Sequence, residues 1–199
     1  LGFIGDGATS TADFHVALNF AGVFQVPCVL VVQNNQFAIS VRPWQQTATE
    51  GYAIKARAYG LPGVRVDGND ALAVHRVIKE AADRARAGGG PTLVEAVTYR
   101  IGAHSSSDDP NRYRDPAEVE EWAQRDPLAR LRRFLERQGA WDEARETVAR
   151  AEHEEQVGRA IREVEAVGPP EADSLFDDVY ATLPWHLQAQ RDELRRRRS

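Results

Sequence analysis

The fold is decided by Leu1-Gly2-Phe3-Ile4-Gly5-Asp6-Gly7 together with Val29-Leu30-Val31-Val32-Gln33-Asn34-Asn35. Each stretch is a short apolar run that ends in turn residues, which is typical of a buried strand. The segment 11–23 between them favours a helix. This strand–helix–strand unit places Asp6 and Asn35 just past two strand ends, at the sheet edge where open parallel sheets bind ligands.

The pair Asp6 and Asn35 offers a carboxylate and an amide oxygen, which are hard ligands of the kind that Mg²⁺ takes beside phosphate oxygens. Gly-Asp-Gly alone or Asn-Asn alone would be ordinary turn chemistry. Together, after two strands, they predict a metal–diphosphate site. Gly5 and Gly7 allow close approach of the backbone to the diphosphate, and N–H groups at the start of the following helix favour its oxygens.

Five motifs occur in order along the chain: GDGATS at 5–10, QNNQFAIS at 33–40, VDGND at 66–70, EAVTYR at 95–100 and HSSSDD at 104–109. In these five motifs, the chain resembles the alpha subunit of a 2-oxo acid dehydrogenase decarboxylase component. It is similar to the branched-chain type and close to bacterial pyruvate dehydrogenase alpha subunits. The resemblance implies an α/β thiamin diphosphate-binding fold, with a parallel sheet flanked by helices and a C-terminal helical extension.

The resemblance also implies the ligands of a magnesium ion. Asp6 and Asn35 would bind it through their side chains, and Phe37 through its backbone carbonyl. Gln33 departs from the family pattern, because some branched-chain relatives place an arginine there, so a phosphate contact would be lost. The implied thiamin diphosphate-binding residues are Gly5, Asp6, Gly7, Ala8, Asn35 and His104.

His104 is expected directly after a strand at 92–98, on the same side of the sheet as the metal ligands. An ordinary exposed loop histidine is the alternative. The resemblance implies that it is a catalytic residue that contacts the cofactor and assists acyl transfer to a lipoyl group. Ser105 matches a serine that is phosphorylated in mitochondrial relatives, which switches the enzyme off; a plain polar connector is the alternative. The second phosphoserine position is Asp115 here.

Strand and helix patterns alternate through residue 104. We expect helices at 49–59 and 71–87 and a strand at 64–66. Beyond it, apolar stripes predict one helix ending near Gly139, one at 142–167 and a third stripe at 175–183. We therefore expect a cofactor-binding core at 1–104, with its N-terminal part missing, and an active-site loop with a helical extension at 105–199. The chain begins on a strand and contains no methionine, so we expect a C-terminal portion of a longer protein.

Composition narrows the functional classes. The net charge of −5 argues against a general nucleic-acid binder. The single cysteine, Cys28, fits a reducing compartment. No run approaches the roughly 20 apolar residues of a membrane span, and no signal or transit pattern is visible. We expect a bacterial-like cytoplasmic protein that binds neither nucleic acid nor membrane.

The expected function is thiamin diphosphate-dependent oxidative decarboxylation of a branched-chain 2-oxo acid such as 3-methyl-2-oxobutanoate, with acyl transfer to a lipoyl domain. An acetyl-transferring pyruvate dehydrogenase is the alternative; a transketolase-like enzyme and a non-enzymatic nucleotide-binding or assembly domain are more distant ones. The resemblance implies a beta subunit, in an assembly of two alpha and two beta chains, and a lipoyl acyltransferase as partners. The beta subunit would supply the glutamate that activates the cofactor's aminopyrimidine. The apolar helical stripes would pack on that subunit or on the sheet.

Overall fold

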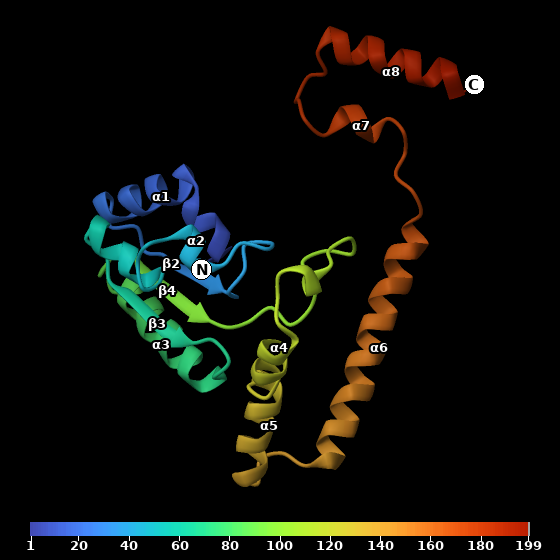
Figure 1. Cartoon of the computed structure of the whole chain (residues 1–199). Coiled ribbons are helices and arrows are strands. Elements are labelled where there is room, and N and C mark those ends of the chain that lie inside the picture. Colours follow the sequence, from blue (N-terminus) through green and yellow to red (C-terminus); the bar gives the residue numbers. More distant parts are fainter. Residues whose placement is uncertain (199) are drawn as a thin grey trace. The chain divides into compact units, whose positions relative to one another are not determined.

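The computed structural model describes residues 1–198 and divides into two compact units, Leu1–Trp141 and Asp142–Ser199. The first unit is built on a sheet with the strand order β1-β2-β4-β3, in which all neighbours are parallel (Figure 1). Its strands are β1 (Gly2–Gly5), β2 (Val29–Asn34), β3 (Gly63–Asp67) and β4 (Thr92–Val97). The predicted parallel α/β sheet is therefore confirmed.

Helices cover both faces of this sheet (Figure 1). On one face, Phe14 and Leu18 of α1 pack in a core cluster with Val32 of β2. On the other face, Ala81 of α3 packs in a second cluster with Val31. Successive strand residues point to opposite faces, so the apolar run of β2 supplies both cores. The helices involved are α1 (Ala12–Val23), η2 (Ala53–Tyr59) and α3 (Ala71–Arg86).

Capping side chains bind the first free N–H groups of α1 and α3. The Thr11 side chain accepts a hydrogen bond from the Phe14 N–H at the start of α1. Asp70 accepts bonds from the N–H groups of Leu72 and Ala73 at the start of α3. The apolar spacing of the helix expected at 71–87 predicts that Leu72 faces the core, but Leu72 is 51% exposed. This expectation was wrong because Leu72 lies in the first turn of α3, where it lines a small pocket with Arg130 of the helix Pro127–Arg137 (α5).

The helix expected at 49–59 is shorter and of a different type. It is the 3-10 helix η2, Ala53–Tyr59, ended by Gly60 at φ +70°. The preceding residues are held in a turn, because the Thr49 hydroxyl donates to the Gly51 carbonyl at 2.7 Å and lies 2.8 Å from the Thr47 hydroxyl. Such local side-chain bonds compete with helical ones.

The rest of the first unit consists of short helices and loops. Arg130 donates to Asp67 and Asp70 at 2.7 and 3.2 Å, which ties α5 to the loop before α3. The remaining elements are η1 (Asp6–Ser10), α2 (Pro43–Gln46), η3 (Pro110–Arg112), α4 (Pro116–Ala123) and α5 (Pro127–Arg137).

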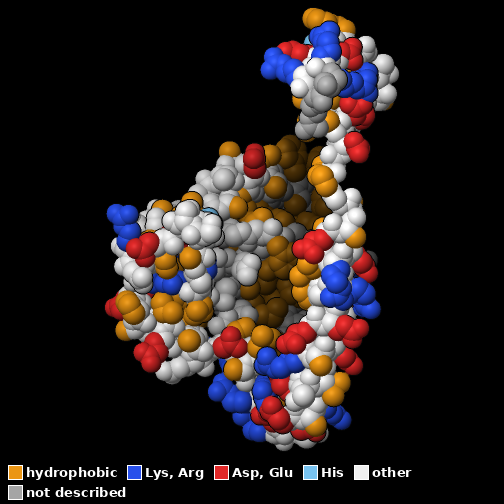
Figure 2. All heavy atoms as spheres, turned by 90° about the vertical axis from the view of Figure 1, so that its right-hand side faces the viewer, with side chains coloured by type: hydrophobic (Ala, Val, Ile, Leu, Met, Phe, Trp, Pro, Cys, Tyr) orange, Lys and Arg blue, Asp and Glu red, His pale blue; other side chains and the backbone are white. Residues whose placement is uncertain are grey.

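The second unit is helical, with α6 (Glu143–Val167), α7 (Ser174–Asp177) and α8 (Trp185–Arg198). The Asp142 side chain accepts the Arg145 N–H and caps α6, as an aspartate at the start of the expected helix favours. Only one helical turn forms within the stripe at 175–183. Charged side chains of both signs lie beside hydrophobic ones on the surface drawn in Figure 2. Among the described residues, no helix has the length and apolar character needed to cross a membrane.

Candidate cofactor and metal site

Asp6 is the first residue after β1 and is almost completely buried, with 1% of its surface exposed. The Nε2 group of Gln46, on α2, donates to Asp6 Oδ2 at 3.0 Å. Burial raises the pKa of the Asp6 carboxyl above its ordinary value, and the Gln46 bond offsets part of that rise. No lysine or arginine of the described chain forms an ion pair with Asp6, so the buried carboxylate can accept a cation.

Asn35 and Phe37 follow β2, the parallel neighbour of β1, and therefore lie at the same edge of the sheet as Asp6. Asn35 Oδ1 accepts the Phe37 N–H at 3.1 Å, and the Phe37 carbonyl accepts from Arg100 at 3.4 Å. Each of these oxygens keeps a second lone pair. A Cβ added at Gly7 would lie 2.8 Å from the Ala38 Cβ. The turn that contains Asp6 is thus in contact with the turn that follows Asn35, and only glycine leaves room for this contact at position 7.

The donor set fits a magnesium–diphosphate group. It combines one carboxylate, one amide and one backbone carbonyl, which are the hard oxygens that Mg²⁺ takes. Two buried polar atoms near Asp6, Gln46 Oε1 and the Tyr52 hydroxyl, lack a hydrogen-bond partner among the described residues. Burial, with the charges of Asp6 and Glu95, raises the pKa of Tyr52. Such orphaned atoms can be satisfied by a further polar group.

The sequence predicted that N–H groups at the start of an α-helix after Gly7 would favour the diphosphate oxygens, and the structure differs on this point. Gly5 precedes the 3-10 turn η1, which contains Gly7 and Ala8, and the α-helix begins only at Ala12. Nothing lies within 4 Å of a Cβ added at Gly5. Backbone N–H groups of the turn, rather than of an α-helix, are therefore placed beside Asp6.

Three residues that contact this site, or the residues next to it, were missed from the sequence. Gln46 bonds Asp6, as described above, and Glu95 accepts a hydrogen bond from Asn34 at 2.7 Å. Lys55 donates from Nζ to the carbonyl and hydroxyl of the fully buried Thr9 at 3.1 and 3.2 Å, and burial lowers the pKa of its ammonium group. Only Glu95 carried a signal in the sequence, since it is a charged residue inside an apolar strand.

His104 does not directly follow a strand end, because β4 ends at Val97 and irregular chain intervenes. His104 is exposed, and its backbone N–H donates to Asp108 Oδ2 at 2.8 Å. The same oxygen accepts the Tyr113 hydroxyl at 2.6 Å. These two bonds, with the Tyr113 bond the stronger influence, hold the pKa of Asp108 below its usual range. Within the described chain, no hydrogen bond joins His104 to Asp6 or Asn35.

Ser105, beside His104, is also exposed, and its hydroxyl lies 3.2 Å from that of Ser107. Among the described residues, no other side chain or backbone group forms a hydrogen bond with the Ser105 hydroxyl. Its expected role as a phosphorylation position stays a prediction.

The parallel sheet and the oxygen-rich edge define an α/β protein with a candidate cofactor-binding site. Sequence comparison gives the family: the chain matches the Dehydrogenase E1 component family over residues 1–173 and belongs to it. This family implies thiamin diphosphate as the cofactor.

Two groups of relatives are informative. The chain is 53% identical, over 97% of its length, to the 3-methyl-2-oxobutanoate dehydrogenase subunit alpha of Mycobacterium tuberculosis. It is 44% identical, over 94% of its length, to the pyruvate dehydrogenase E1 component subunit alpha of Staphylococcus aureus. It spans 53% and 51% of these relatives, about half their length. The resemblance to alpha subunits of this family is confirmed.

Proposed function

We propose that the complete protein catalyses the oxidative decarboxylation of a 2-oxo acid with thiamin diphosphate and Mg²⁺, and passes the acyl group to a lipoyl domain. The observation that carries this proposal is the buried Asp6 carboxylate, which has no ion-pair partner among the described residues and shares a sheet edge with Asn35 and Phe37. Membership in the dehydrogenase E1 component family supports it.

In this proposal, the residues of this chain bind the metal ion and orient the cofactor. Asp6, Asn35 and the Phe37 carbonyl hold the metal, and the glycine-flanked turn with Gly7 and Ala8 approaches the diphosphate. When bound, thiamin diphosphate supplies the nucleophilic carbon and the electron sink for decarboxylation. Burial of Asp6 keeps water away from the metal contact, where electrostatic attraction is stronger than in solvent.

The proposed assembly contains two of these alpha chains, two beta subunits and a lipoyl acyltransferase, in the bacterial cytoplasm. Support comes from the names of the relatives, which are subunits or components of larger enzymes. In this proposal, the beta subunit forms part of the pocket for the 2-oxo acid.

We expect His104→Ala to slow acylation of the lipoyl domain by about 10²–10⁴-fold, the usual effect of losing a general acid or base. Because His104 is exposed and forms no hydrogen bond with Asp6 or Asn35 among the described residues, cofactor affinity should change little. Single-turnover acylation and cofactor titration on the assembled enzyme measure both. His75→Ala, at an exposed position of α3, is the control. Weakened cofactor binding with normal acylation per bound site would reverse the assignment.

We expect the assembled enzyme to prefer 3-methyl-2-oxobutanoate over pyruvate. The branched-chain relative is the more similar of the two, at 53% against 44% identity. A pocket that accommodates extra methyl groups gains about 1–3 kcal/mol, or roughly 10–200-fold in kcat/KM. Comparing kcat/KM for the two acids tests the substrate, and a clear preference for pyruvate would support the acetyl-transferring alternative instead. Turnover of neither acid in the presence of all components would contradict the proposed function.

A further inference from the structure

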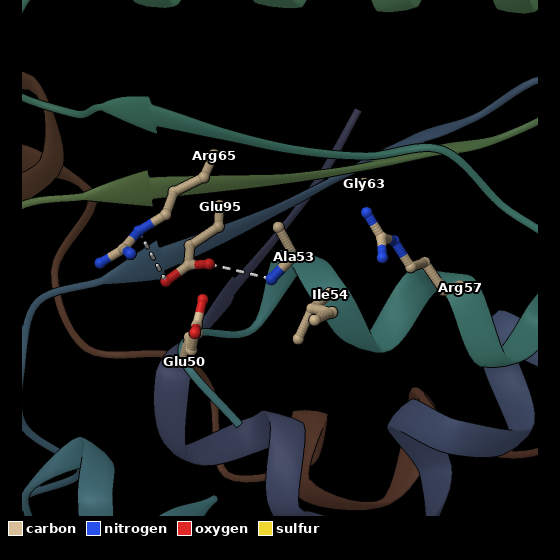
Figure 3. A pocket seen from close by; sticks show the side chains of 8 residues that line it. Glu50, Ala53, Ile54, Arg57, Gly63, Arg65 and Glu95 are labelled. Atoms are coloured by element: carbon tan, nitrogen blue, oxygen red, sulfur yellow. Dashed lines mark hydrogen bonds and ion pairs between the residues drawn. The ribbon is translucent and has the colours of Figure 1, made fainter. Parts of the chain in front are cut away.

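Glu95 is a fully buried carboxylate in the middle of β4 that the proposed chemistry does not use. Its Oε1 atom accepts from Asn34 Nδ2 at 2.7 Å and lies 3.8 Å from Arg65 Nε. Its Oε2 atom accepts the N–H groups of Tyr52 and Ala53 at 2.8 and 2.9 Å. Figure 3 shows the carboxylate between Arg65 and the start of η2. A buried charge needs such compensation, so these donors fix its position and in turn are fixed by it.

The contact with Asn34 reaches the turn that carries two of the proposed metal ligands. Because Asn34 Nδ2 points to Glu95, its Oδ1 faces the turn and accepts from the backbone N–H and Nε2 of Gln36 at 3.2 and 3.0 Å. Gln36 has φ +70°, a left-handed conformation that costs energy for a residue with a side chain. Asn35 and Phe37 flank Gln36, so the directions of their oxygens depend on this held conformation.

The other carboxylate oxygen reaches the Asp6 side of the site. It anchors the first N–H groups at the start of η2, and η2 carries Lys55. Lys55 in turn holds the backbone carbonyl of Thr9, in the η1 turn that begins with Asp6. One side chain therefore connects the two halves of the motif, which come from different strands.

We propose that Glu95 is a positioning residue that fixes the Asn34–Phe37 turn, and through η2 the Asp6 turn, in the shape that binds magnesium and diphosphate. The identity of the bound group rests on the proposed function, whereas the ordering of the turn does not. Partners of this kind, which hold metal ligands without touching the metal, are typically worth 10–100-fold in metal affinity.

The test begins with two single variants of the complete alpha chain assembled with its beta subunit. Glu95→Gln turns an NH₂ group toward the NH₂ group of Asn34, and Asn34→Asp sets two carboxylates against each other. Each should weaken Mg²⁺ binding in the presence of thiamin diphosphate by about 10–100-fold. Each should also speed amide hydrogen exchange at 34–38 in the protein without metal or cofactor, which is a readout independent of activity.

The double variant Asn34→Asp/Glu95→Gln separates positioning from damage. It restores the hydrogen bond with donor and acceptor exchanged and leaves the net charge unchanged. Both Mg²⁺ affinity and turn exchange should return to within about threefold of the wild type, a non-additivity expected only for residues that act through each other. Glu154→Gln, at an exposed position on α6, is the matched control and should change neither value.

Folding is checked by circular dichroism and thermal midpoint. If the single variants fold poorly, Asn34→Ala removes the link to Gln36 without placing a second charge beside Glu95, and should show the same loss and the same faster exchange. Single variants with wild-type affinity and exchange would overturn the proposal. A double variant that neither folds better nor binds Mg²⁺ more tightly than the single variants would also overturn the proposal. A wild-type assembly that does not bind Mg²⁺ and thiamin diphosphate would instead overturn the proposed function, and the exchange data would still decide the role of Glu95.

Discussion

Asp6→Asn is expected to abolish Mg²⁺-dependent binding of thiamin diphosphate by the complete protein. The substitution keeps an oxygen for the Gln46 bond but removes the only charge in the proposed ligand set. Substituting a residue that holds a metal ligand without touching the metal typically lowers metal affinity by about 10–100-fold. Loss of a direct anionic ligand should therefore lower that affinity by at least about 100-fold. Cofactor titration in the presence of Mg²⁺ measures the effect. Asp13→Asn, at an exposed position in α1, is the control, and retained affinity in Asp6→Asn would remove Asp6 from the metal site.

The same substitution should not weaken the folded protein in the absence of metal. Burial raises the pKa of Asp6 above its ordinary value of 3.8. The folded state therefore holds this proton more tightly than the unfolded state, and stability falls as the pH rises from about that value through the folded-state pKa. Asp6→Asn removes this loss, so its thermal midpoint at neutral pH should equal or exceed that of the metal-free wild type. A marked decrease would show that Asp6 is a structural rather than a ligand-binding carboxylate.

The isolated chain is expected to show no 2-oxo acid decarboxylation. In the assembly that the family resemblance implies, a beta subunit supplies the glutamate that activates the cofactor, and losing one general acid or base costs roughly 10²–10⁴-fold. The surface is consistent with missing partners, since Phe20 and Phe24 of the first unit stack on each other while remaining 51% and 68% exposed. Turnover is measured for this chain, for the complete alpha chain alone and for the alpha–beta assembly. Decarboxylation by the isolated chain would contradict the shared active site.

Local sequence patterns predicted the parts of the fold that depend on interactions between residues close together in the sequence. The strand ends before Asp6 and Asn35 follow from apolar runs bounded by turn residues, and the caps at Asp70 and Asp142 follow from their side-chain oxygens. The helix expected at 49–59 begins later than predicted, because hydrogen bonds of Thr49 hold the preceding residues in a turn.

The supporting contacts of the candidate site were not predictable in this way. Gln46 meets Asp6 across 40 positions of the chain, and Glu95 meets Asn34 across 61. The Glu95–Asn34 pair arises because β4 lies beside β2 in the sheet, and the Gln46–Asp6 pair because α2 folds back onto the turn after β1. Periodicity along the chain encodes neither contact. The sequence therefore predicted candidate metal ligands, but it did not predict the residues that contact them and their neighbours.

The central claim is that this sheet edge binds thiamin diphosphate through a magnesium ion. Titration calorimetry of the complete alpha chain, assembled with its beta subunit, tests it when thiamin diphosphate is added once in Mg²⁺ and once in excess chelator. We predict saturable binding in Mg²⁺ that is lost in chelator and is also lost in Asp6→Asn. Binding that is absent in both solutions, or equal in both, would contradict the account.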